Sequence, residues 1–261
     1  MFCLSPLRRC GFSSTLWALI AAIFLVACSP APFDDVSSRK LPIINGEVSA
    51  SGFLPAVGAL VVRDFFGSYQ AFCTATLISK RWAVTAAHCL KSDQIPAGTP
   101  TWMYFGNAVG PDAAKRVIGV KKSYPHPNFK GGSAPGGLAD WYDIGLVEFV
   151  SDVPVAPMKM ITLQEVGPAL RLGDPLLIVG FGQSNASNPQ SAGVKHDGFS
   201  KLAMVGSSEI YIDDKTGSTT CHGDSGGPTF VDVSKTSTPD YRHVGVTSRG
   251  AEGCTLGSVE T

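Results

Sequence analysis

Short apolar runs, broken by Gly, Pro, Asn or Asp, follow one another from residue 43 onward. Runs of this length and spacing are typical of β-strands joined by turns. We predict strands in six segments: 56–62, 75–87, 116–124, 143–149, 175–182 and 243–248. No long segment repeats apolar residues at helical spacing, and only 86–90 predicts a short helical turn. The pattern therefore indicates an all-β sandwich or barrel.

Three further stretches lack this pattern. The segments 131–137 (GGSAPGG) and 184–193 (SNASNPQSAG) are rich in small and polar residues, which predicts surface loops. The segment 29–42 is polar, contains Pro and has no periodicity, so we interpret it as a tether or propeptide.

The first 28 residues carry the features of an export signal. Arg8 and Arg9 precede an apolar run, 16–26, that is too short to span a bilayer comfortably. The stretch ends in LVAC and resembles a bacterial lipobox, in which Cys28 is lipidated and becomes the mature N-terminus. Ser29 follows and favours sorting to the outer membrane. An ordinary signal peptide with an incidental cysteine is the alternative.

Composition narrows the class of protein. The 261 residues include 21 basic and 21 acidic ones, so the formal net charge is zero. A balanced charge gives no electrostatic reason to bind nucleic acid, and we expect no nucleic-acid partner. The length allows one large or two small domains. Charged residues are sparse at 16%, while Gly and Pro are plentiful, which supports many turns and short strands.

The seven cysteines divide between the leader and the exported domain. Four lie in the exported domain: Cys73, Cys89, Cys221 and Cys254. An even number in an exported domain predicts two disulfides, and four cysteines allow three pairings. Zinc binding is the rival use, but the spacings contain no C-x-x-C pair.

Three short segments combine the residues that nucleophilic catalysis requires. TAAHC (85–89) contains His88, DIGL (143–146) begins with Asp143, and GDSGGP (223–228) contains Ser225. A serine hydroxyl is a weak nucleophile alone. It needs a base to accept its proton, and that base needs a partner that fixes its tautomer.

With these motifs in this order, together with HPNF (126–129) and GFG (180–182), the chain resembles the chymotrypsin-like serine peptidases from residue 43 to about 257. The resemblance implies two six-stranded antiparallel β-barrels, about 43–155 and about 156–261, with the active site in the cleft between them. It also implies a polypeptide substrate, no cofactor and no metal.

The resemblance assigns a role to each residue of the motifs. Ser225 is expected to be the nucleophile, His88 the general acid and base, and Asp143 the residue that orients the imidazole. The backbone N–H groups of Gly223 and Ser225 are expected to form the oxyanion hole. The family pairs the cysteines that match Cys73 with Cys89 and Cys221 with Cys254.

Activation is expected to differ from the usual family pattern. In the family, proteolysis frees an N-terminus that pairs with the Asp before the nucleophile; here these residues are Ile43 and Asp224. Pro42 precedes Ile43, where Arg or Lys is usual. We therefore expect a zymogen cut near Lys40 by an activating peptidase and trimmed after Pro42. If Cys28 carries the lipid, this cleavage separates an inactive anchored form from an active released one.

The residues expected to contact substrate also depart from the family. They are Thr219, Thr220, His222, Ser248, Arg249 and Gly250. Thr219 stands where basic-residue peptidases carry Asp, so cleavage after Lys or Arg is not expected. A pocket for an uncharged side chain is preferred, and Arg249 with His222 leaves an acidic preference open.

The short segment after Cys254 contains seven residues, whereas the family continues with another strand and a helix. Either the sequence is truncated here or the second barrel closes differently from the family, and a missing strand would leave this barrel incomplete with an exposed sheet edge. Two other functions are considered: a non-catalytic binding protein with the same fold, and an esterase with the same triad. The order of the triad residues is wrong for the α/β-hydrolase fold, which argues against an esterase of that type.

Overall fold

The computed structural model describes residues 43–91, 98–213, 215, 217–234, 236–255 and 257–261. The expected signal peptide, the tether and the lipidation candidate Cys28 lie outside the described residues. Within the described part, no helix is long and apolar enough to cross a membrane.

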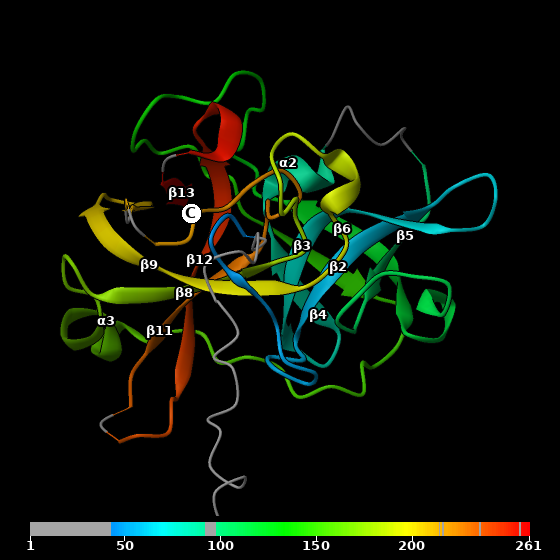
Figure 1. Cartoon of the computed structure of the whole chain (residues 1–261), viewed down its shortest axis with the longest axis horizontal. Helices are drawn as coiled ribbons and strands as arrows, with labels where there is room; N and C mark the ends of the chain where they lie inside the picture. The colour runs from blue at the N-terminus through cyan, green and yellow to red at the C-terminus, as the bar shows by residue number, and fades with distance from the viewer. Residues whose placement is uncertain (1–42, 92–97, 214, 216, 235, 256) are drawn as a thin grey trace, which may run out of the picture. The chain divides into compact units, whose positions relative to one another are not determined.

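Six antiparallel strands close the first barrel (Figure 1). They are β2 (Val57–Arg63), β3 (Tyr69–Ser79), β4 (Trp82–Thr85), β5 (Thr101–Tyr104), β6 (Val117–Pro125) and β7 (Gly145–Phe149). Their order around the barrel is β2-β3-β4-β7-β6-β5. Large buried side chains fill the interior, among them Leu60, Leu77 and Phe149. Burying each such side chain contributes about 1.5–3 kcal/mol before entropy is counted.

Six further antiparallel strands close the second barrel (Figure 1). They are β8 (Pro175–Gly180), β9 (His196–Val205), β10 (Ile210–Ile212), β11 (Pro228–Asp232), β12 (Tyr241–Gly250) and β13 (Ser258–Glu260). The order is β9-β10-β13-β12-β11-β8, and β8 pairs with β9 to complete the circle. The short strand β1 (Glu47–Val48) is added to β9. The predicted fold class, two six-stranded antiparallel barrels, is confirmed.

The second barrel is closed, so the alternative in which it lacks a strand is wrong. Strand β13 pairs with β10 on one side and with β12 on the other. The three residues of β13, Ser258–Glu260, therefore fill the gap between β10 and β12. Sequence reasoning missed this strand because it is short and its apolar content is one valine.

Several elements differ from the predicted ones. The predicted strand 75–87 is a hairpin, because β3 ends at Ser79 and β4 begins at Trp82. Strands β1, β5, β9, β10, β11 and β13 were not predicted. Neither was helix α3 (Leu163–Ala169), although its capping box is written in the sequence as Thr162 and Glu165. The predicted turn at 86–90 is helix α2 (Ala87–Leu90), and single 3-10 turns occur at Ala113–Lys115, Pro189–Ser191 and Glu252–Cys254.

Strand β3 connects the first barrel to the loop that carries Ser225. The backbone N–H of Thr74 donates to the carbonyl of Ser225 (2.8 Å), and its hydroxyl donates to the carbonyl of Gly223 (3.0 Å). The same hydroxyl oxygen accepts from the N–H of Phe181 (3.1 Å). One buried threonine thus fixes the serine loop against the barrel that holds His88.

Candidate active site

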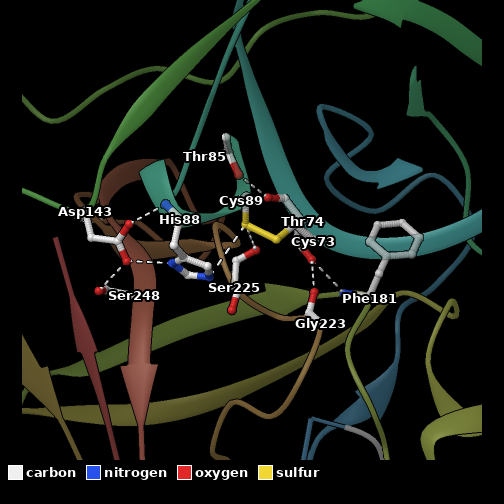
Figure 2. The surroundings of a disulfide bond; sticks show 10 residues. All are labelled: Cys73, Thr74, Thr85, His88, Cys89, Asp143, Phe181, Gly223, Ser225 and Ser248. Atoms are coloured by element: carbon white, nitrogen blue, oxygen red, sulfur yellow. Dashed lines mark hydrogen bonds and ion pairs between the residues drawn. A yellow bond between two sulfur atoms is a disulfide. The ribbon is translucent and has the colours of Figure 1, made fainter. Parts of the chain in front are cut away.

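The imidazole of His88 is held by a buried carboxylate. Nδ1 of His88 lies 2.7 Å from Oδ2 of Asp143, and the backbone N–H of His88 donates to Oδ1 (2.8 Å). The hydroxyl of Ser248 on β12 donates to Oδ2 as well (2.7 Å). Asp143 is 1% exposed, so these three donors satisfy it without solvent. Because Nδ1 faces the carboxylate, Nε2 is the nitrogen left to exchange a proton (Figure 2).

Ser225 lies on the Nε2 side of this imidazole. Sγ of Cys89 is 3.8 Å from Nε2 of His88 and 3.6 Å from the carbonyl oxygen of Ser225. Both residues therefore lie next to the same sulfur atom. Figure 2 shows the imidazole between Asp143 and Ser225. The hydroxyl of Ser225 and Nε2 are not hydrogen-bonded to each other. Bonds of this kind are often long in substrate-free enzymes.

Two glycines allow the backbone to turn sharply around Ser225. Gly223 and Gly226 have φ angles of +96° and +78°, which side chains rarely adopt. A Cβ at Gly226 would lie 2.0 Å from Oγ1 of Thr85 and 2.5 Å from the carbonyl of Thr74. Since Thr74 also positions the serine loop, no side chain fits at this turn.

Two backbone donors around Ser225 have no partner in the described part of the chain. The N–H groups of Asp224, Gly226 and Gly227 donate to carbonyls, at distances of 2.7–3.0 Å. Those of Gly223 and Ser225 make no such bond among the described residues. Such amides are what an oxyanion hole requires, since they can bind a developing negative charge without first breaking a bond.

Asp224 is a fully buried carboxylate. Its oxygens accept from the N–H groups of Gly182 and Cys221, both at 2.8 Å. Burial raises its pKa to about 7, although these two hydrogen bonds oppose the shift. Ile43 is also buried, in the core of the second barrel, and makes no hydrogen bond or ion pair with Asp224 among the described residues. In this uncut chain, its nitrogen is an amide and carries no charge.

A cavity of about 210 Å³ opens beside Ser225. It is lined by Thr220, Cys221, His222, Ser225, Thr247, Ser248, Arg249, Gly250, Ala251 and Cys254. Five of the six residues expected to contact substrate line it. Thr219 does not line it, and its N–H donates to the carbonyl of Ile44 (3.0 Å). Sequence reasoning missed Thr247 and Ala251, which neighbour the predicted segment in sequence.

Arg249 does not present a free positive charge to this cavity. Its guanidinium donates to both carboxylate oxygens of Glu209, at 2.8 and 2.7 Å. Glu209 is buried and was not recognised from the sequence. The pair is neutral overall, which removes the main reason to expect a preference for acidic side chains.

A second buried carboxylate lies behind the cavity wall. Glu260 on β13 accepts hydrogen bonds from the hydroxyls of Thr229 (2.9 Å), Thr247 (3.0 Å) and Ser258 (2.7 Å). Burial raises its pKa, and the three hydroxyls oppose that effect. Thr247, which lines the cavity, is thus hydrogen-bonded to this carboxylate. Nothing in the local sequence pattern distinguishes it from an exposed glutamate.

The four cysteines of the domain form two disulfides. Cys73 is bonded to Cys89 and Cys221 to Cys254, the pairing that the family resemblance implies. The first joins β3 to the helix that carries His88 (Figure 2). The second joins the serine loop to the opposite wall of the cavity. All four sulfurs are thus engaged, which removes these cysteines as zinc ligands.

Comparison of the sequence with known proteins finds similarity to serine proteases. The sequence model of the family described as Trypsin matches residues 43–260. Serine protease Hayan of Drosophila melanogaster is 26% identical over 235 residues, which are 80% of this chain and 35% of that protein. Chymotrypsin-like elastase family member 1 of Rattus norvegicus is 26% identical over 232 residues, 80% of each chain. Transmembrane protease serine 11E of Mus musculus is 28% identical over 187 residues, 62% of this chain and 39% of that protein.

Proposed function

The chain belongs to the trypsin family, and on that premise we propose that it is a serine endopeptidase that hydrolyses peptide bonds through an acyl-enzyme. One observation carries the proposal: a buried carboxylate fixes Nδ1 of His88, so that Nε2 is directed to the side on which Ser225 lies. In the described part of the chain, the N–H of Gly223 and the N–H of Ser225 itself have no hydrogen-bond partner.

The mechanism follows from this arrangement. Nε2 of His88 accepts the proton of the Ser225 hydroxyl as its oxygen attacks the substrate carbonyl. The N–H groups of Gly223 and Ser225 stabilise the negative charge that forms on the carbonyl oxygen. The imidazolium then donates its proton to the leaving amine, and Asp143 stabilises the charged ring. Water, activated by the same nitrogen, hydrolyses the acyl-enzyme.

The test is labelling of the protein that starts at Ile43 with a serine-directed fluorophosphonate. We expect the label on Ser225, none in Ser225→Ala, and cleavage of peptide substrates by the wild type. Asp143→Asn should lower kcat about 10⁴-fold, because the imidazole then adopts the wrong tautomer. Arg242→Gln, a change remote from these residues, serves as the control and should label normally.

A non-catalytic binding protein with the same fold is the alternative. The presence of all three triad residues in one arrangement argues against it. Failure of the folded, correctly processed protein to label would favour it. Binding of an intact polypeptide without cleavage would then be its activity.

We propose that the cavity beside Ser225 accepts an uncharged side chain. Arg249 is neutralised by Glu209, and the Glu260 carboxyl is enclosed by three hydroxyl donors, so the cavity lining offers hydroxyls rather than an unpaired charge. An unpaired Lys or Asp side chain would be desolvated there without compensation. Peptide substrates that differ only at this position should therefore be cleaved at least about 100-fold faster with Ala, Val or Leu than with Lys or Asp. Faster cleavage after Lys would contradict the assignment.

Maturation is proposed to generate the ammonium that Asp224 requires. A buried carboxylate whose pKa is raised by desolvation is stabilised in its charged form by a cation. A free N-terminus at Ile43 is the cation that the family resemblance suggests. Cleavage near Lys40 by an activating peptidase, followed by trimming after Pro42, would produce it.

Export and anchoring complete the proposal. We propose that residues 1–28 direct export and that Cys28 carries a lipid, which places the uncut chain at the outer membrane or cell surface. The residue pattern R-R, an apolar run and LVAC supports this. Since Ile43 must become free, activation would release the peptidase domain from its anchor.

A further inference from the structure

The segment that leads to Asp143 has little packing of its own. Four of the residues in 131–137 are glycines: Gly131, Gly132, Gly136 and Gly137. A Cβ at any of them would meet nothing within 4 Å, and most of the segment is exposed. Glycine-rich backbone loses much entropy when it is ordered. External contacts must therefore hold this loop in place.

Arg249 and Glu209 supply those contacts. The guanidinium of Arg249 donates to the carbonyls of Pro135 (3.1 Å) and Gly137 (2.7 Å). Oε2 of Glu209 accepts from the N–H of Ala139 (2.7 Å). The two side chains are themselves joined by a bidentate ion pair and are only 11% and 1% exposed. Such a pair is geometrically stiff and little screened by solvent.

Two neighbouring serines add hydrogen bonds to the same loop. We call the residues that hold this loop, Arg249, Glu209, Ser207 and Ser208, its seat. The hydroxyls of Ser207 and Ser208 both donate to Oδ1 of Asp140, at 2.7 and 2.8 Å. Three positions from 137 to 140 are thus hydrogen-bonded to strand β12 or to the segment that precedes β10. Asp143 follows three residues after the last of them.

Two routes connect this seat to Asp143. Along the chain, Tyr142 has a φ angle of +54°, which is strained for a residue with a side chain, and its ring stacks on His126 at 5.0 Å. Through side chains, the guanidinium of Arg249 donates to Oγ of Ser248 (3.3 Å), and Ser248 donates to Asp143. Loosening the seat would therefore disturb both the backbone before Asp143 and one of its three donors.

We propose that Arg249 and Glu209 form a clamp that positions Asp143, and that Arg249 is a positioning residue rather than a contact for substrate charge. This inference rests on the proposed function of the triad. It replaces the expected role of Arg249 in recognising an acidic substrate. The clamp acts through Asp143 on His88, so it should affect the chemical step with every substrate, whatever its length.

The experiment compares Arg249→Gln with Arg242→Gln. Arg242 is a matched control, because it lies on the same strand, its side chain is 12% exposed, and it pairs with Glu165 and Asp240. Steady-state rates are measured with a single-residue ester and with a longer peptide. For Arg249→Gln we expect kcat to fall about 10- to 100-fold with both substrates at nearly unchanged KM, as displacement of a catalytic group does. Arg242→Gln should leave kcat unchanged.

Amide hydrogen exchange tests the clamp without catalysis. In the Ser225→Ala background, the N–H of Ala139 reports the bond to Glu209, and the N–H of His88 reports the bond to Asp143. Arg249→Gln should raise both exchange rates at least about 10-fold, whereas Arg242→Gln should change neither. Arg249→Lys keeps the positive charge but loses the planar guanidinium, so its exchange rates should lie between those of the wild type and Arg249→Gln. This variant can be measured if Arg249→Gln folds poorly.

Two outcomes would overturn the proposal. If exchange at His88 is unchanged while that at Ala139 rises, the pair holds the loop but does not position Asp143. If only KM for the longer peptide rises, Arg249 merely shapes the substrate groove. A wild type that neither labels nor cleaves would refute the proposed function, and the exchange measurement would still decide whether the clamp exists.

Discussion

At the scale of single residues, Asp224 shows how a buried charge links stability to processing. Its pKa is raised to about 7 because burial disfavours the carboxylate and no cation lies beside it in the described part of the uncut chain. Between pH 3.8 and about 7, the folded state therefore binds a proton that the unfolded state has lost. It follows that this residue lowers the stability of the uncut chain as the pH rises through that range.

Asp224→Asn should remove this pH dependence. A shift from 3.8 to about 7 corresponds to about 4 kcal/mol of unfolding free energy. We expect the uncut wild type to lose about that much more stability than the variant between pH 4 and pH 7.5. Urea unfolding at several pH values measures the difference. Equal slopes for the two proteins would show that the carboxylate is ionised throughout.

The stability of the wild type must be compared with that of Asp224→Asn at each pH, because two histidines change the stability in the opposite direction. Burial lowers the pKa of His243 to about 3 and that of His196 to about 4. Their unfolded forms gain a proton below about pH 6.5, so the folded state loses stability as the pH falls. Both nitrogens of His243 are also buried without a partner among the described residues. These effects are common to the wild type and the variant and cancel.

At the scale of elements, the three-residue strand β13 holds the second barrel closed. It pairs with two strands, and Glu260 collects three hydroxyl donors from β11, β12 and β13 itself. Without it, β10 and β12 would present unpaired edges, and the hydroxyls of Thr229 and Thr247 would lose their acceptor. Unpaired edges promote association between chains.

Removal of residues 258–261 should therefore open the second barrel. We expect loss of a cooperative unfolding transition, increased binding of a hydrophobic dye and self-association, all measurable by calorimetry, fluorescence and light scattering. A milder change, Glu260→Gln, keeps the strand pairing and should retain a cooperative transition at lower stability. A truncated protein that melts like the full chain would show that β13 is dispensable.

At the scale of the whole molecule, the proposed maturation couples location to activity. Ile43 is 1% exposed and packs in the core of the second barrel. Trimming to this residue would convert its amide nitrogen into an ammonium and so add a positive charge. The same cut would detach everything before residue 43, including Cys28.

This coupling predicts two separable forms. The uncut, lipid-modified chain should fractionate with membranes and label at least about 100-fold more slowly with fluorophosphonate than the soluble form. N-terminal sequencing of the active form should give Ile-Ile-Asn-Gly. A different N-terminus, or full labelling of detergent-extracted lipidated protein, would contradict the proposal.

Local sequence patterns were sufficient for part of the fold. Alternating or continuous apolar runs predicted β2, β6, β7, β8 and β12, because strands buried on a barrel interior must carry such runs. Short strands such as β10 and β13 escaped detection, because three residues give no measurable period. Helix α3 was missed for a different reason: its capping box is local, but it carries no buried residue and so no apolar stripe.

The sequence by itself determined the family and the candidate catalytic residues, because the motifs around His88, Asp143 and Ser225 reflect the backbone geometry that each residue needs. Only the tertiary structure decided which charged side chains are buried and which of them form ion pairs. Glu209 and Glu260 are ordinary in sequence, and their burial depends on strands far away along the chain. Pairing Arg249 with Glu209, 40 residues apart, turned an expected substrate contact into a neutral clamp. Electrostatic partners are set by distances through space, and a local pattern does not contain them.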